Sequence, residues 1–111
     1  MIIDYINMAE EVKPNFKGGQ KEYNVKMFTD GTNKIMRGRL VPGASIGFHT
    51  HTEDQEVIFF LEGTGTIVDV EGNVVEVGLP GQAHYCAKNE SHSLVNMGDV
   101  DLVFFAVVTA V

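Results

Sequence analysis

Three histidines and one glutamate are spaced so that they could bind a single metal ion. His49 and His51 are two positions apart, so both side chains point to the same face of an extended strand. Glu56 follows after a short polar connection, and His92 stands much later, where a neighbouring strand could bring it back. Three imidazole nitrogens and one carboxylate oxygen suit a divalent transition metal. Each of these features alone has a plainer interpretation. His49 and His51 could be a polar pair on the surface, Glu56 a charge at the edge of a strand, and His92 a histidine in a loop.

Short strands must position these residues, because the sequence alternates brief apolar runs with turn residues. Its 12 glycines are scattered, and Asp30-Gly31, Pro42-Gly43 and Pro80-Gly81 are turn signals. About eight short strands at this close spacing predict an all-β sandwich or barrel. The predicted strands are residues 23–29, 34–41, 55–61, 64–70, 74–77, 82–87, 92–96 and 101–109.

The first residues of the chain predict at most one short helix. Asn7 could cap it, Glu10 could return a hydrogen bond to the cap, and Pro14 would end it soon afterwards. The length of 111 residues is sufficient for one domain only. Within it, we expect residues 1–33 to form an N-terminal segment with the first strands, packed on the barrel or on a partner subunit. Residues 34–111 would then form the barrel itself.

The composition excludes several classes of protein. The chain has 8 Lys and Arg against 15 Asp and Glu, for a formal net charge of −7. It therefore lacks the basic surface that nucleic acid or an anionic membrane would require. The one cysteine, Cys86, excludes an intrachain disulfide and a cysteine-based zinc site. No apolar run is long enough to span a bilayer and the first residues do not resemble a signal peptide, so we expect a cytoplasmic protein.

The region from residue 34 to residue 109 resembles the cupin superfamily. Gly43, the pair His49 and His51, Glu56 and Gly63 fall at the offsets of the first sequence motif of that family. This motif is highly specific, because five residue types must occur at fixed separations. The segment that follows it is just long enough for one hairpin, as in compact cupins.

The second motif of the family is matched less completely. Gly81, His92 and Asn96 fall on its pattern, but Ala87 stands where proline is usual and Asn89 where glycine is usual. Alanine gives up the fixed φ of proline, whereas asparagine is the residue best able to adopt the positive φ of glycine. We therefore expect the turn to be kept with less rigidity.

This resemblance implies a small antiparallel jelly-roll β-barrel with a metal near one mouth. In cupins the residues that match His49, His51, Glu56 and His92 commonly hold manganese, iron, nickel, zinc or copper. Four protein ligands on a six-coordinate metal leave positions for water, oxygen or substrate. Three neutral imidazoles and one carboxylate leave a single net positive charge on the site, which favours a bidentate oxyanion.

Other residues could contact a ligand inside the barrel. Strand alternation places His84 in the interior, where it could carry protons beside the metal ligands or simply pack under the barrel mouth. Counting inward along the strand after the glutamate, Ile58 and Phe60 should line the cavity. Arg37 or Arg39 could hold a substrate carboxylate if their face looks inward, or could form salt bridges on an outer or dimer-interface face.

The strand that ends the chain predicts a further contact surface. Phe104 and Phe105 lie on a segment that is apolar on both faces, so both faces should be covered. In so short a barrel the second cover could be another subunit. Small cupins are commonly dimers, and this adds to the prediction of a homodimer.

Three kinds of function are compatible with these residues. The first is a metal-dependent enzyme that acts on a small oxyanionic or carbonyl metabolite, as a dioxygenase, decarboxylase, isomerase or lyase. The ligand set is shared by all four reaction types and cannot choose among them. The alternative is a non-catalytic cupin that binds or senses a metal-bound small ligand. A purely structural metal is a third interpretation, and it is disfavoured because a chain that is 44% hydrophobic should fold without one.

Overall fold

The computed structural model describes residues 1–111, and the chain is built almost entirely from strands. Its one helical element is the three-residue 3-10 turn η1 (Phe16–Gly18). No helix that could cross a membrane is present. The strands are β1 (Glu11–Pro14), β2 (Glu22–Thr29), β3 (Lys34–Leu40), β4 (Ser45–Thr50), β5 (Asp54–Glu62), β6 (Gly65–Val68), β7 (Val74–Gly78), β8 (Ala83–Cys86), β9 (Ser91–Val95) and β10 (Leu102–Ala110).

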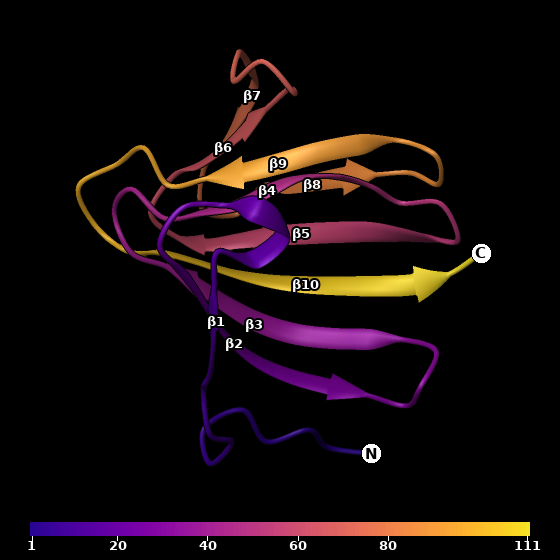
Figure 1. Ribbon diagram of the computed structural model, residues 1–111. Coiled ribbons are helices and arrows are strands. Elements are labelled where there is room, and N and C mark those ends of the chain that lie inside the picture. The colour runs from indigo at the N-terminus through magenta and orange to yellow at the C-terminus, as the bar shows by residue number, and fades with distance from the viewer.

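The strands form two antiparallel sheets that enclose the core, as Figure 1 shows. One sheet has the order β1-β2-β3-β10-β5-β8, and the other has the order β4-β9-β6-β7. Long sequence separations between neighbouring strands, such as β3 beside β10, give the jelly-roll connectivity that the sequence predicted. The predicted all-β fold is therefore confirmed. Two strands were missing from the predicted set: β1, and β4, which carries one of the site histidines.

The short helix expected from Asn7 is wrong. The side chain of Asn7 donates to the Asp4 carboxylate at 2.6 Å instead of capping a helix, and the same carboxylate accepts the backbone N–H of Ile6. Pro14 ends strand β1, whose backbone pairs with β2 in an antiparallel register. Pairing with the edge of a sheet gives hydrogen bonds to backbone N–H and C=O groups that would have had no partner in so short a helix.

The core is filled by the inward side of each strand. Along β5, Glu56, Ile58 and Phe60 point inward while Val57 and Phe59 are exposed, as alternation predicts. The Phe60 ring is enclosed by two glycines: a Cβ at Gly65 or Gly78 would lie 2.2 or 2.0 Å from the ring. Both glycines are therefore needed to admit this ring, which fills the barrel at the end of β5 away from the glutamate.

The outer face of β10 is covered in part by the same chain. The ring of Tyr5 meets Phe105 edge-on at 5.5 Å, and the Tyr5 hydroxyl donates to the Ile35 carbonyl at 2.6 Å. The expected cover on this face thus comes partly from the N-terminal segment. Phe59 and Tyr85 on the same outer side stay exposed, and the homodimer that would cover them stays a prediction.

Candidate metal centre

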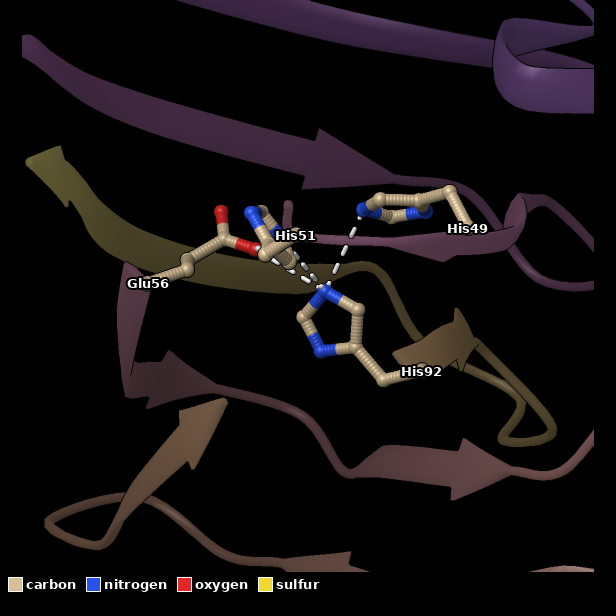
Figure 2. A group of neighbouring side chains, drawn as sticks. All are labelled: His49, His51, Glu56 and His92. Carbon is tan, nitrogen blue, oxygen red and sulfur yellow. Dashed lines mark hydrogen bonds and ion pairs between the residues drawn. The ribbon is translucent and has the colours of Figure 1, made fainter. Parts of the chain in front are cut away.

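The four residues at the centre of the sequence prediction meet inside the barrel, where the two sheets face each other. His49 lies on β4, His51 directly follows it, His92 lies on β9 and Glu56 lies near the start of β5. Figure 2 shows the three imidazoles and the carboxylate converging, with His92 at the centre of the contacts. One nitrogen or oxygen from each residue lies within 4.8 Å of the others. The site thus joins one sheet to the other.

Strand register and one turn bring the histidines together. His49 is paired directly with His92 across the antiparallel strands β4 and β9. The backbone of His51 pairs with the turn before β9: its N–H donates to the Glu90 carbonyl at 3.0 Å, and its carbonyl accepts from Asn89. Asn89 has φ +69°, so the expected positive φ at this position is confirmed. Asparagine tolerates this left-handed conformation better than other non-glycine residues.

The ligand atoms are spaced as donors around one ion would be. His92 Nε2 lies 3.0 Å from His51 Nε2, 3.2 Å from His49 Nε2 and 3.1 Å from the Glu56 carboxylate. His51 Nε2 lies 3.3 Å from the same carboxylate oxygen. Two donors that are each about 2.1 Å from a metal are about 3.0 Å apart at a right angle and about 3.4 Å apart at a tetrahedral angle. The residues therefore fit a divalent transition metal.

The outward nitrogens of His49 and His51 determine where their protons lie. His49 Nδ1 is 2.7 Å from the Gly47 carbonyl, and His51 Nδ1 is 2.6 Å from the Asp54 carboxylate. Both partners can only accept, so each Nδ1 carries a hydrogen and a neutral ring presents its Nε2 lone pair to the centre. A single hydrogen on His92 Nε2 could not bond at once to the Nε2 lone pairs of His49 and His51 and to the Glu56 carboxylate, whereas a cation at the centre could bind all of them.

The environment of each ligand alters its pKa in a direction that follows from its contacts. Burial alone would raise the pKa of Glu56, but hydrogen bonds from His51 and His92, which form when these imidazoles carry a hydrogen on Nε2, lower it to about 2. Burial lowers the pKa of His49 by more than its bond to the Gly47 carbonyl raises it. The hydrogen bond with Glu56 raises the pKa of His51 despite partial burial. The carboxylate is thus anionic, and a proton competes with a metal better at His51 than at His49.

A cavity of about 360 Å³ opens beside the four residues, all of which line it. Ile58 borders this cavity, as the sequence predicted, and its role in binding a ligand stays a prediction. Tyr23, from a strand that the sequence analysis gave no role in the site, borders it too. The apolar side chains of its wall come from β2 and from single residues of η1, β3, β4, β5, β9 and β10, and exposed Lys17 and Lys34 lie at its open side. This volume suits a small metabolite.

Two residues predicted to bind substrate lie elsewhere, and these predictions are wrong. Arg39 points away from the cavity and pairs with Glu10 at 2.7 Å and with Asp101 at 3.4 Å. Along β3 the inward positions are occupied by Met36, Gly38 and Leu40, which leaves both arginines on the outer face. Phe60 does point inward, but it lies beyond Ile58 against the two glycines and does not reach the cavity.

His84 points into the barrel from β8, as strand alternation predicted, and Cys86 on the same face of the strand is buried as well. His84 Nε2 lies 2.9 Å from His92 Nδ1, and His84 Nδ1 contacts the carboxylate of Glu76. His84 is therefore placed directly behind a candidate ligand, although a role in proton transfer stays a prediction. Burial raises the pKa of the Cys86 thiol to about 11, which agrees with a packing residue.

Sequence reasoning missed the residues that orient the histidines. Asp54 stands three positions after His51 in the polar connection, so its position held a usable signal. Glu76 lies on a hairpin strand whose alignment with β8 and β9 depends on the register of the sheets. No local pattern could have identified it.

Comparison with known proteins agrees with this geometry. The family model of the cupin domain matches residues 36–108. A protein of Thermotoga maritima named oxalate-binding protein is 29% identical over 114 residues, which cover 97% of this chain and 93% of that protein.

Solved structures give the same result. A crystal structure of a "predicted oxalate decarboxylase" from Thermotoga maritima has a TM-score of 0.89 and 28% identity and covers 100% of both chains. A sugar phosphate isomerase of the cupin superfamily from Silicibacter pomeroyi has a TM-score of 0.79 at 21% identity, with 100% of this chain and 76% of that chain covered. At this identity the second structure supports the fold alone.

Proposed function

This chain belongs to the cupin family, and we propose that it binds a divalent transition metal that in turn holds a small bidentate oxyanion, with oxalate as the first candidate. The observation that carries the proposal is the convergence of His49, His51, Glu56 and His92 on one point, with neighbouring donor atoms 3.0 to 3.3 Å apart. When bound, the ion supplies a Lewis acid and, for manganese, iron or copper, a redox centre.

Charge and size support a small oxyanion. A divalent ion held by one carboxylate and three neutral imidazoles keeps a single net positive charge, which attracts an anion. The cavity of about 360 Å³ admits a small metabolite, and Lys13, Lys17 and Lys34 border it together with the acidic residues Glu53, Asp54 and Glu56. Both the curated Thermotoga maritima protein and the crystal structure from that organism have names that refer to oxalate, and the similarity extends along nearly the whole chain. Oxalate is therefore the reasonable first ligand.

Tyr23 is the residue of the cavity wall best suited to contact the ligand. Its hydroxyl is buried and donates to the Met36 thioether at 3.2 Å, which is a weak acceptor. Burial raises the pKa of Tyr23 far above its usual range, so the phenol stays protonated. A ligand oxygen would be a stronger acceptor than the thioether. Tyr23 would thus donate to the oxyanion on the side away from the metal.

Turnover of the ligand is the second candidate function. The phenol of Tyr23 borders the cavity and, because burial raises its pKa, acts there as a hydrogen-bond donor, so the proton that a product gains would come from water. For oxalate, decarboxylation breaks the carbon–carbon bond, releases carbon dioxide and adds one proton to the remaining fragment to give formate. A dioxygenase, isomerase or lyase acting on another small carbonyl compound would use the same metal site.

The test uses the full chain, stripped of metal with a chelator and then titrated with Mn²⁺, Co²⁺ or Zn²⁺. We expect one metal ion per chain, and calorimetry should then detect oxalate binding to the loaded protein but not to the stripped protein. Acetate, with one carboxylate, should bind more weakly. Equal oxalate binding with and without metal would overturn the proposal, as would failure of all three ions to bind. Formation of formate by the loaded protein would favour turnover over binding alone.

A further inference from the structure

We infer that Glu76 and His84 are positioning residues that hold His92 in one tautomer, with its hydrogen on Nδ1 and its Nε2 lone pair directed at the metal. This inference rests on the proposed function for the identity of the site. It assigns a task to two residues that do not contact the ligand or the ion themselves.

The contacts form a continuous chain across three strands. Glu76 on β7 contacts His84 Nδ1, and His84 Nε2 on β8 lies 2.9 Å from His92 Nδ1 on β9. The rings of His84 and His92 are 5.2 Å apart with an interplanar angle of 29°. Both rings are buried, so no competing water is needed to complete their hydrogen bonds.

Glu76, at the outer end of this series of hydrogen bonds, determines which atom donates at each step. An ionised carboxylate can only accept, so His84 Nδ1 carries a hydrogen directed at Glu76. A neutral His84 then has a lone pair on Nε2, which accepts from His92 Nδ1–H. His92 in turn keeps a lone pair on Nε2, facing the other ligands. The opposite tautomer of His92 would place a hydrogen where the metal must bind.

The three histidine ligands are therefore oriented by different means. His49 and His51 each donate directly to an oxygen atom, from the Gly47 carbonyl and the Asp54 carboxylate. His92 has no oxygen acceptor within the barrel at its Nδ1, and a second imidazole extends the connection to a carboxylate. Glu76 is exposed, so this carboxylate stays solvated while it orients a buried pair. Partners of this kind typically change metal affinity 10- to 100-fold.

A different use of His84 must be separated from this one. His84, Cys86 and His92 each offer a ligand atom within 4.8 Å of the others, so they could form a second metal site. The 2.9 Å contact between the two imidazoles already has the geometry of a hydrogen bond, and burial keeps the thiol protonated. Both observations favour the hydrogen-bonded chain, and the stoichiometry of metal binding distinguishes the two arrangements.

The experiment measures the tautomer of His92 and the affinity for metal separately. In metal-free protein, long-range ¹⁵N–¹H correlation spectra should assign the hydrogen of His92 to Nδ1. In His84→Phe, which keeps a ring but removes the acceptor, the tautomers should become mixed and Zn²⁺ affinity should fall about 10- to 100-fold in chelator competition. His84→Gln, whose amide oxygen can accept, should restore part of both. Glu76→Ala, at an exposed position, should give a smaller change in the same direction.

Tyr85→Phe is the matched control, because Tyr85 lies on the opposite, exposed face of β8 and should change neither measurement. A hydrogen on Nε2 of His92 in the metal-free wild type would overturn the inference. So would unchanged tautomer and affinity in both His84→Phe and Glu76→Ala, or two metal ions per chain with a thiolate charge-transfer band that Cys86→Ser removes. If the wild type binds no metal, the proposed function fails, but the tautomer of metal-free His92 still tests this inference.

Discussion

Two clusters of charged and polar side chains in this barrel differ in how completely their hydrogen-bond donors and acceptors are paired. On the outer face, Arg39 donates to Glu10 and Asp101, and each of its three guanidinium nitrogens has an acceptor. Inside the barrel, imidazole Nε2 atoms and a carboxylate oxygen face the same point. The first arrangement is complete as it stands, whereas the second has more acceptors than hydrogens. Converging lone pairs, rather than charge, mark the candidate site.

Burial separates the two clusters further. The side chain of His92 is 3% exposed and that of Glu56 is 13%, against 31% for Arg39 and 44% for Asp101. Exposed ion pairs stabilise a protein by up to about 1 kcal/mol, because water screens them and the side chains lose rotamer entropy. Groups in the interior have no such screening, so the inner cluster should respond far more strongly to the loss of one member.

The largest effect is expected from His51→Ala, which removes one ligand from the inner cluster. We expect the Zn²⁺ dissociation constant to rise at least about 100-fold, because three remaining ligands hold the ion less tightly and the ligand geometry is broken. The barrel should remain folded, with an unchanged far-ultraviolet circular dichroism spectrum. Calorimetry with Zn²⁺ provides the measurement, and Arg39→Met serves as a control with wild-type affinity. Unfolding of the metal-free variant would instead indicate that the cluster is structural.

We expect the two clusters to lose their interactions at different pH values when the solution is acidified. Metal release follows protonation of the imidazoles, and His51 takes up a proton before His49 because its hydrogen bond with Glu56 raises its pKa. Release should therefore begin as the pH falls toward the histidine range and be complete by about pH 4. Arg39 lowers the pKa of Glu10, so the outer pair stabilises the fold above the unfolded glutamate value, near pH 4.3, and loses this effect only below it.

Elemental analysis after dialysis at a series of pH values provides the measurement. Over most of this range the protein should stay folded while it loses metal, which circular dichroism can follow in the same samples. Retention of a full equivalent of metal at pH 4 would contradict ligation by histidine.

Tyr23→Phe should have a smaller effect, limited to the ligand. Removing one neutral hydrogen bond should weaken oxalate binding to the metal-loaded protein by about 2- to 10-fold, corresponding to roughly 0.5–1.5 kcal/mol. Affinity for the metal itself should not change, because the phenol does not belong to the ligand set. Calorimetric titrations with Zn²⁺ and then with oxalate measure the two steps separately. Weakened metal binding would assign Tyr23 to the structure of the cluster instead.

Sequence reasoning predicted the inner cluster more accurately than the outer one for a physical reason. The spacing of His49, His51 and Glu56 depends on the period of a strand and one short connection, both of which are local. Which face of β3 carries Arg39 depends on where the sheets meet, and alternation alone leaves two choices. For the N-terminal segment that supplies Glu10, the sequence predicted at most one short helix and no strand, so the acidic partner of the arginine could not be anticipated.

The same distinction explains the remaining differences inside the barrel. Alternation correctly predicted that Ile58 and Phe60 point inward. It could not predict how far along the interior the cavity extends, because that depends on Gly65 and Gly78, which come from another part of the chain and admit the Phe60 ring. Contacts such as Glu76 with His84 likewise depend on register between sheets, which no local pattern encodes.

The smallest effect is expected from Arg39→Met, which removes the charge from the outer cluster and keeps much of the apolar stem. We expect the free energy of unfolding to fall by up to about 1 kcal/mol at neutral pH, because the exposed pairs with Glu10 and Asp101 are lost. The difference from wild type should decrease with added salt, which screens the pairs in the parent protein. Urea denaturation at low and high salt measures it, with Arg37→Met as a control for loss of one positive charge on the same face of β3. Oxalate affinity of the metal-loaded variant should equal that of the wild type, since the guanidinium lies outside the cavity. A drop in oxalate affinity without a change in stability would instead show that Arg39 contributes to oxalate binding. The distinction between an inner binding cluster and an outer ion-pair cluster would then fail.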